Sequence, residues 1–535
     1  MSRTGGEWVV EALAREGVRH VFGIPGIHNL AVYDALLRQS AISHVLARHE
    51  QGAAFMADGY ARASGTPSVV LVTSGPAATN TITPLAESYS GSIPVVVVMS
   101  DIASTLVGRD LGALHEVANQ IDCFRPVTRW AEALTDGAAI PSTLAGAFEL
   151  LRTGRPGPMA ISIPNDLLGA RVEAHLPPRS AGGRPPCHVA DVEAAAGLLR
   201  SAQRPLIIAG GGVVAAGAER ELTALARRLQ APIVTTVSGR GVIDERDPLW
   251  HSVLPDRRAT AGALAAADIV FAVGTKLGHR SMEKLGAGLG AQPLLHMDLD
   301  PSVIGRQYKA RLPIVGDARD GLAGLLAALG PGEGRSAWDR ARLSALRADT
   351  GPRFTREVED TIATLRASLP DDAIVVNDQT GLTYWMEYKF PVRAPRTFLY
   401  PTGSAVLGYG VPAAIGAKLA RPERAVIAVA GDGGFMFSVA ELATAVKYRL
   451  PIVFLVVNDE RLGAIKYLQE KFYAGRWGET ELANPDFPAL ARAFGAHGER
   501  LPSIAALPAA IERALGADRP TVLELRLSLE PPWEF

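Results

Sequence analysis

The sequence predicts an α/β protein of three doubly wound domains with mostly parallel sheets. Short runs of Val, Ile and Leu alternate along the whole chain with longer stretches rich in Ala, Leu and Arg, which is typical of βαβ units. The 535 residues correspond to about three domains at roughly 150 residues each. Two breaks rich in Pro and Gly, at residues 176–186 and 330–334, divide the chain.

We therefore expect domains at residues 1–175, 187–330 and 350–530. The order of strands and helices in the first and third domains looks alike, which suggests that the two are related units. The expected elements of the first domain are strands at residues 43–47, 68–72 and 94–99 and helices at residues 51–63 and 78–89. Those of the third are strands at residues 425–430 and 452–457, a loop at 431–434 and a helix at 439–448.

The composition excludes several classes of protein. The 54 Lys and Arg nearly balance the 55 Asp and Glu, so the net charge of −1 gives no electrostatic reason to expect nucleic acid or an anionic membrane as a partner. A hydrophobic fraction of 48% excludes a disordered chain. Two cysteines, Cys123 and Cys187, are too few for a disulfide framework. The N-terminus lacks the apolar core of a signal peptide, and no apolar run approaches the roughly 20 residues that span a bilayer. We expect a cytoplasmic location.

Three polar residues follow predicted strands. Glu50, Asp432 and Asn458 each lie at the carboxyl end of a strand, where ligands of open parallel sheets bind. Asp432 and Asn458 are 26 residues apart, close to the length of one βαβ crossover, so the ends of their strands can lie side by side. A carboxylate and an amide oxygen suit Mg²⁺. The adjacent Gly431, Gly433 and Gly434 let backbone N–H groups approach a phosphate.

A plain strand-to-helix turn is the alternative interpretation of Gly431-Asp432-Gly433. Glu50 likewise has a simpler interpretation, as a carboxylate that caps a helix. The chain contains no Gly-x-x-x-x-Gly-Lys-Ser/Thr loop, which excludes a P-loop nucleotide site.

Several motifs together resemble the thiamine-diphosphate enzymes related to acetohydroxyacid synthase and pyruvate decarboxylase. The resemblance covers almost the whole chain and keeps the family's order. It is carried by residues 48–62 with Arg48-His49-Glu50, residues 73–80, 154–158 and 297–301, the Gly431-Asp432-Gly433 motif and Asn458.

The resemblance implies a pyrimidine-binding first domain, a Rossmann-like central domain and a diphosphate-binding third domain. Glu50 would hydrogen-bond the aminopyrimidine ring of thiamine diphosphate as a catalytic residue, and Mg²⁺ would be held by Asp432, Asn458 and the backbone carbonyl of Glu460. Leu407 matches the apolar side chain beneath the bent cofactor, and the carbonyl of Ala405 would accept from its amino group. The implied cofactor-binding residues are Glu50, Pro25, Ser74, Asn80, Thr380, Gly381, Leu382, Ala405, Leu407, Gly431, Gly433 and Gly434.

Two histidines and one segment bear on the substrate. His28 and His115 fall in loops that line the active site in relatives, where they would relay protons, although a lone histidine is more often structural. Residues 462–473 follow the synthase pattern, but Leu468 replaces a tryptophan and Ala464 a methionine. The implied substrate pocket comprises Ala464, Tyr467, Leu468 and Glu470.

The resemblance leaves the reaction open. The leading expectation is decarboxylation of a 2-oxo acid followed by joining of the acyl carbanion to a carbonyl acceptor, as in acetolactate synthase. The alternative is a decarboxylase that does not ligate, for example of a guanidino-2-oxo acid, whose cationic group would meet Glu116 or Glu470. A more remote alternative is a non-catalytic cofactor-binding homologue.

The resemblance also bears on other ligands and on assembly. Synthases bind a non-redox FAD, but their Gly-Met-His-Gly signature is absent near residues 250–254, so we expect no FAD. We expect a homodimer or homotetramer with active sites at the subunit interface.

Overall fold

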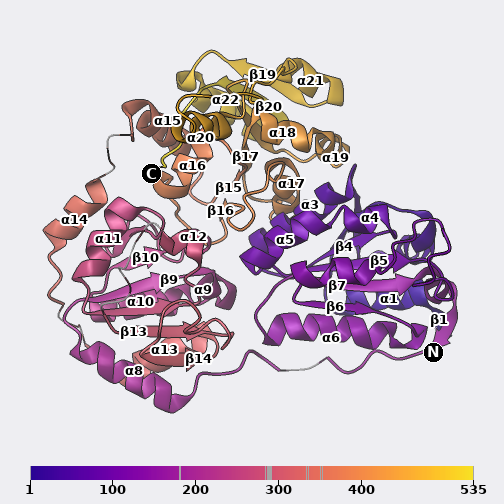
Figure 1. Ribbon diagram of the computed structural model, residues 1–535, viewed down its shortest axis with the longest axis horizontal. Helices are drawn as coiled ribbons and strands as arrows, with labels where there is room; N and C mark the ends of the chain where they lie inside the picture. Colours follow the sequence, from indigo (N-terminus) through magenta and orange to yellow (C-terminus); the bar gives the residue numbers. More distant parts are fainter. Residues whose placement is uncertain are drawn as a thin grey trace. The chain divides into compact units, whose positions relative to one another are not determined.

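The computed structural model describes residues 2–179, 182–283, 285, 289, 292–332, 334, 336–349, 351 and 353–533. Twelve residues that belong to the predicted domains and breaks lie outside the described residues: Met1, Ser180, Ala181, Lys284, Gly286, Ala287, Gly288, Gly290, Ala291, Glu333, Thr350 and Pro352. The chain forms two compact units (Figure 1). The first contains Met1–Gly182, Ile374–Thr380 and Pro401–Ser528, and the second contains Gly183–Ala373, Gly381–Tyr400 and Leu529–Phe535.

The N-terminal part of the first unit is a parallel sheet in the order β3-β2-β4-β5-β7-β6. Its strands are β2 (His20–Gly23), β3 (Ser43–Leu46), β4 (Ser68–Val72), β5 (Val95–Asp101), β6 (Trp130–Ala133) and β7 (Met159–Pro164). Its main helices are α1 (Gly5–Arg15), α2 (Leu30–Leu37), α3 (Glu50–Ser64), α4 (Pro76–Thr79), α5 (Ile82–Gly91) and α6 (Ile140–Thr153).

Both faces of this sheet are buried, which explains the unbroken valine runs of β4 and β5. Val21 faces an apolar core that it shares with α1, α2 and α6. The next residue, Phe22, points to the opposite face and contacts Tyr60 of α3, with ring centroids 5.8 Å apart. The predicted strands 43–47, 68–72 and 94–99 are thus confirmed to within two residues at each end, whereas the predicted helix 78–89 is divided into α4 and α5.

The C-terminal part of the first unit repeats this arrangement. Its parallel strands β15 (Ile374–Asn377), β17 (Val426–Gly431), β18 (Val453–Asn458), β19 (His497–Leu501) and β20 (Thr521–Arg526) lie in the order β15-β17-β18-β20-β19. This matches the order β2-β4-β5-β7-β6. The helices include α17 (Gly410–Ala420), α18 (Asp432–Phe437), α19 (Leu442–Lys447), α20 (Gly463–Phe472), α21 (Phe487–Phe494) and α22 (Leu507–Leu515). The predicted 431–434 loop is wrong in extent, because α18 already begins at Asp432.

The second unit is built on a parallel sheet in the order β11-β10-β9-β12-β13-β14, which is the order of dinucleotide-binding folds. Its strands are β9 (Pro205–Ala209), β10 (Ile233–Thr235), β11 (Trp250–Val253), β12 (Ile269–Val273), β13 (Leu294–Asp298) and β14 (Leu312–Val315). Helices α8 (Val189–Ser201), α10 (Glu219–Leu229) and α13 (Ala318–Leu329) share one core with it, and α11 (Arg257–Ala266) belongs to a second core. Helix α16 (Gly381–Lys389) also belongs to this unit. Among the described residues, no helix is long and apolar enough to cross a bilayer.

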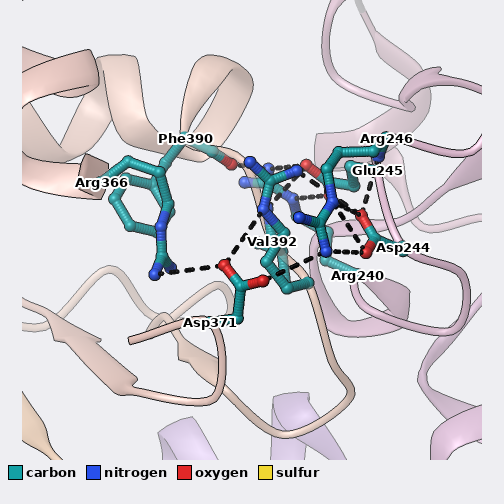
Figure 2. Close-up of polar contacts among 9 residues, drawn as sticks. Arg240, Asp244, Glu245, Arg246, Arg366, Asp371, Phe390 and Val392 are labelled. Carbon is teal, nitrogen blue, oxygen red and sulfur yellow. Dashed lines mark hydrogen bonds and ion pairs between the residues drawn. The ribbon is translucent and has the colours of Figure 1, made fainter. Parts of the chain in front are cut away.

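A buried ion pair attaches residues 386–392 to the connection between β10 and β11 (Figure 2). Arg240 and Glu245 are only 3% and 4% exposed and form two parallel hydrogen bonds of 2.8 Å. Arg240 also donates to the carbonyl oxygens of Met386 and Phe390, and Glu245 accepts from the N–H of Val392 at 3.0 Å. Because every partner is withdrawn from water, neither charge can be removed without leaving the other uncompensated.

We predict that Arg240→Ala lowers the free energy of unfolding by about 3–5 kcal/mol, because Glu245 stays buried without its partner. The matched control is Arg246→Ala. Arg246 pairs with Asp244 and Asp371, but its side chain is 59% exposed, so we expect little change. Denaturant unfolding of the two variants measures the difference, and equal losses would contradict the assigned role of Arg240.

Candidate active site

Glu50 is the first residue of α3, directly after the turn that leaves β3. His49 caps this helix, because its Nδ1 accepts from the N–H of Gln51 at 3.1 Å. The half-buried Glu50 carboxylate accepts a 2.9 Å hydrogen bond from the side-chain amide of Asn80, at the end of α4. The structure thus brings together two of the predicted site residues that are 30 positions apart.

His28 and His115 both lie next to the Ser74 hydroxyl and next to each other. The Ser74 hydroxyl oxygen is 2.6 Å from Nδ1 of His28 and 3.5 Å from Nδ1 of His115, and the two imidazole centroids are 5.4 Å apart. Burial and the neighbouring His115 lower the pKa of His28. Ser74 itself is fully buried, so the hydroxyl links two imidazoles that are both half-buried. The exposed Pro25 lies three residues before His28.

The side chain of Gln120, which the sequence analysis did not identify, holds the turn at Ser74 and Gly75 by hydrogen bonds. Gln120 accepts from the N–H of Gly75 at 2.7 Å and donates to the carbonyl of Ser100 at 2.9 Å. Gly75 has a φ of +62° and lies against the backbone of His115, where a Cβ would overlap. The turn at Gly75 therefore packs directly against the backbone of the loop that carries His115.

The side chains of Asp432 and Asn458 both accept a hydrogen bond from the side chain of Asn484. The side-chain amide of Asn484 donates to Asp432 Oδ2 at 2.6 Å and to Asn458 Oδ1 at 3.1 Å. They converge because β17 and β18 are adjacent parallel strands, with Gly431 in register with Val457. Asp432 is 2% exposed, and burial raises the pKa of its carboxyl group. The sequence analysis did not identify Asn484, which lies between α20 and α21, outside any strand end.

Glu460 and the glycines complete this region. Glu460 has a φ of +56°, its N–H donates to Asn458 Oδ1 at 3.1 Å, and its carbonyl accepts from Leu482 at 2.8 Å. Gly433 donates to Asp432 Oδ1 at 3.0 Å, and a Cβ on Gly434 would lie 2.7 Å from a carboxylate oxygen of Asp378. Thr380, three residues after β15, approaches Gly431 closely. The backbone on both sides of Asp432 therefore packs too closely against Thr380 and Asp378 to accommodate larger residues at Gly431 and Gly434 without a shift.

The remaining predicted residues differ in their surroundings. Ala405 is exposed and has a φ of +50°, and Leu407 is half-buried. Gly381 and Leu382 begin α16 in the second unit, where Leu382 is fully buried. The carboxylate of Glu116 accepts from the N–H groups of Leu111 and Ala113, at 3.3 and 2.8 Å, and these backbone donors lower its pKa. Glu116 is therefore engaged by its own loop.

The predicted substrate-pocket residues, Ala464, Tyr467, Leu468 and Glu470, all lie on α20, none of whose residues is buried. Glu470 pairs with Lys466 at 3.8 Å. Ile465 and Phe472 on the same helix are 48% and 56% exposed.

Comparison with known proteins assigns the three parts of the chain. Residues 3–123, 192–325 and 378–525 match, in order, the thiamine pyrophosphate enzyme N-terminal TPP binding domain, central domain and C-terminal TPP binding domain. The chain is 39% identical to a probable 2-ketoarginine decarboxylase of Pseudomonas aeruginosa, over 98% of this chain and 94% of that protein. The chain belongs to the thiamine pyrophosphate enzyme family.

Other relatives of this thiamine pyrophosphate enzyme are synthases. It is 34% identical to a probable acetolactate synthase large subunit of Methanocaldococcus jannaschii, over 97% of this chain and 91% of the relative. It is 35% identical to the acetolactate synthase isozyme 3 large subunit of Escherichia coli, over 92% and 88%. The predicted resemblance and the predicted fold of three α/β domains are confirmed. The boundaries at residues 175, 187, 330 and 350 stay predictions.

The residues around Asp432 fit the diphosphate end of thiamine pyrophosphate with a hard cation. Two oxygen atoms, one anionic and one from an amide, already point at a single hydrogen-bond donor, the Asn484 amide. A small divalent cation prefers such an oxygen pair and completes its shell with phosphate oxygens and water. Because Gly431, Gly433 and Gly434 carry no Cβ, phosphate oxygens meet no side chain from them.

We predict that Asp432→Asn weakens the binding of Mg²⁺, measured calorimetrically with thiamine diphosphate present, by roughly tenfold or more, because Asp432 would supply the negative charge on the protein side of the site. Glu479→Gln removes an exposed carboxylate from the same domain and serves as the control for net charge. Equal Mg²⁺ affinity of Asp432→Asn and the unsubstituted protein would show that the cation binds elsewhere.

Proposed function

We propose that this protein uses thiamine diphosphate and Mg²⁺ to decarboxylate a 2-oxo acid and that the carbon losing CO₂ is then protonated. The observation that carries this proposal is the cluster of His28, Ser74 and His115. When bound, the cofactor supplies the electron sink that cleavage of the C1–C2 bond of a 2-oxo acid requires. Proton delivery to that carbon requires a group of suitable pKa within hydrogen-bond reach, and imidazoles meet this requirement.

The chain's own residues have distinct parts in this proposal. Asp432, Asn458 and the Glu460 carbonyl hold the cation, and Gly431, Gly433, Gly434 and Thr380 surround the diphosphate. Glu50 holds a proton at the aminopyrimidine ring, with Asn80 fixing the orientation of its carboxylate. Ser74 carries a proton between the two imidazoles. Because the pKa of His28 is lowered, its imidazole is more often neutral and can accept this proton from Ser74.

Joining of the acyl group to a carbonyl acceptor is the second candidate. It is supported by the acetolactate synthases among the relatives and by the synthase-like residues 462–473. The substrate class is likewise a proposal. A guanidino-2-oxo acid is supported by the relative named as a probable 2-ketoarginine decarboxylase. Glu116 accepts from its own loop and Glu470 pairs with Lys466, so both stay candidates to meet a cationic substrate.

We further propose a homodimer or homotetramer with sites at the subunit interface, in the cytoplasm. The exposed Ile465, Phe472 and Tyr473 support such an interface, since apolar side chains that are 48–60% exposed are stabilised when a second chain covers them. The absence of FAD stays a prediction, which the visible absorption spectrum of the purified protein tests.

Product analysis tests the proposed reaction. With ¹³C-labelled 2-oxo acids, thiamine diphosphate and Mg²⁺, we expect NMR to show CO₂ and the aldehyde one carbon shorter. Pyruvate and a 5-guanidino-2-oxo acid are the two substrates to compare. Ser74→Ala should lower aldehyde formation and steady-state CO₂ release to the same extent, because the carbon that loses CO₂ must be protonated before the site can react again. Acetolactate as the main product from pyruvate would establish the second candidate instead.

The role of Glu50 has its own test. Glu50→Gln should reduce kcat roughly 100- to 10,000-fold, because a general acid–base contact is lost, while the affinity for thiamine diphosphate changes little. Glu149→Gln, an exposed residue of α6, is the control. If Glu50→Gln turns over at the original rate, Glu50 takes no part in the reaction.

A further inference from the structure

Two glutamates outside the set described above join the two related halves of the first unit. The halves meet where α3 packs on α17 at backbone distance. A Cβ on Gly59 would overlap the carbonyl oxygen of Ala413, and a Cβ on Gly416 would overlap that of Met56. The two helices are equivalent in the repeated topology, since α3 directly precedes β4 and α17 directly precedes β17.

Glu441 reaches from the C-terminal half to the turn that begins α3. It lies between β17 and β18 and is 1% exposed. Its carboxylate accepts from the backbone N–H groups of Arg48 at 3.1 Å and His49 at 3.0 Å, and from the Thr444 hydroxyl at 2.7 Å. A Cβ on Gly52 would overlap the same carboxylate. Burial raises the pKa of Glu441, and these donors oppose that shift.

Glu87 makes the corresponding contact in the opposite direction. It lies on α5, between β4 and β5, and is fully buried. Its carboxylate accepts from the N–H groups of Gly403 at 3.2 Å and Ser404 at 2.7 Å, at the start of the loop that leads into α17. Arg62 of α3 lies 3.3 Å from it and compensates its charge. Each half thus places one buried glutamate against the backbone of the other half's turn.

The far end of the 403–410 loop is held in the same manner. Asp378, at the end of β15, accepts from the N–H groups of Gly408 at 3.3 Å and Gly410 at 2.7 Å. Between these two anchored ends, Ala405 adopts a left-handed φ of +50°, which costs free energy for a residue with a Cβ. The loop keeps this conformation only while both of its ends are fixed.

We propose that Glu441 and Glu87 are a reciprocal pair of positioning residues, Glu441 for Glu50 and Glu87 for Ala405 and Leu407. The proposal rests on the proposed function, because that function assigns these three residues to the cofactor. A buried carboxylate suits this role, since hydrogen bonds from backbone N–H groups to an anion are stronger than those to a neutral acceptor. The first three residues of the loop, Gly403, Ser404 and Ala405, have no large side chain that could fix them by apolar packing.

The first test needs no cofactor. Amide hydrogen exchange of the full-length protein is measured for Glu441→Gln and Glu87→Gln. We expect exchange at Arg48 and His49 to rise roughly 10- to 100-fold in Glu441→Gln alone, and exchange at Gly403 and Ser404 to rise similarly in Glu87→Gln alone. Unchanged exchange at a turn whose glutamate has been replaced would overturn the proposal.

The second test separates positioning from mere stability. Thiamine diphosphate binding and turnover are measured for the same variants. Glu441→Gln should lower kcat by at least about tenfold with little change in cofactor affinity, because it displaces Glu50. Glu87→Gln should weaken cofactor affinity by about tenfold, because it releases the loop that contacts the cofactor. Unchanged kcat and unchanged cofactor affinity in both variants would overturn the proposal, whatever their exchange.

Further variants keep both tests decisive. If either glutamine variant fails to fold, Gly52→Ala and Gly403→Ala retain the glutamates but place a methyl group against Glu441, or against Ser90 beside Glu87. We expect these variants to change amide exchange at the two turns and the affinity for thiamine diphosphate in the same directions as the glutamine variants.

Glu245→Gln is the matched control, because Glu245 is a buried glutamate of the second unit that also accepts from a backbone N–H. It should lower Tm and leave amide exchange at Arg48, His49, Gly403 and Ser404 unchanged. Failure of the unsubstituted protein to bind thiamine diphosphate would reject the proposed function, while the exchange test would still decide whether the glutamates hold the turns.

Discussion

The candidate site depends on the contact of α3 with α17 at backbone distance. Helices with ordinary side chains at the contact lie 8–10 Å apart, and only residues without a Cβ permit a closer approach. Gly59 and Gly416 provide this approach from opposite sides. The contact joins the helix that begins with Glu50 to the helix that follows Leu407. Across it, the Tyr409 hydroxyl donates to the buried Asp58 at 3.0 Å.

Close packing of this kind also explains why so many charges are buried there. Loops that must expose backbone N–H groups to a ligand carry small residues, and small residues bury little apolar surface. Buried carboxylates replace the missing apolar contacts with directed hydrogen bonds. The charges are in turn compensated: Arg62 is paired with both Asp58 and Glu87, at 2.5 and 3.3 Å. Unpaired, each carboxylate would cost far more free energy than it contributes.

The sequence predicted most of what lies at strand ends. Runs of Val and Ile predict the parallel strands. Because the carboxyl ends of parallel strands lie at one edge of a sheet, the topology then predicts where Glu50, Asp432 and Asn458 lie. Asn484, Glu87 and Glu441 were missed for a physical reason. Asn484 lies outside any strand end, and the other two are isolated acids on short helices, a pattern that usually indicates a solvated surface. Only the fold shows that Glu87 is fully buried beside a turn more than 300 positions away.

The repeated topology explains why the two glutamates form a reciprocal pair. Two halves with the same strand order pack through equivalent helices, so a contact made in one direction has a counterpart in the other. Glu441 and Glu87 occupy equivalent places between the strands of their halves, yet the turns they hold have diverged, one carrying a carboxylate and the other an apolar side chain. The acceptor that orders each turn belongs to the other half. The geometry of each turn is therefore a property of the pair, and this explains why the two halves belong to one compact unit although about 190 residues separate them in the chain.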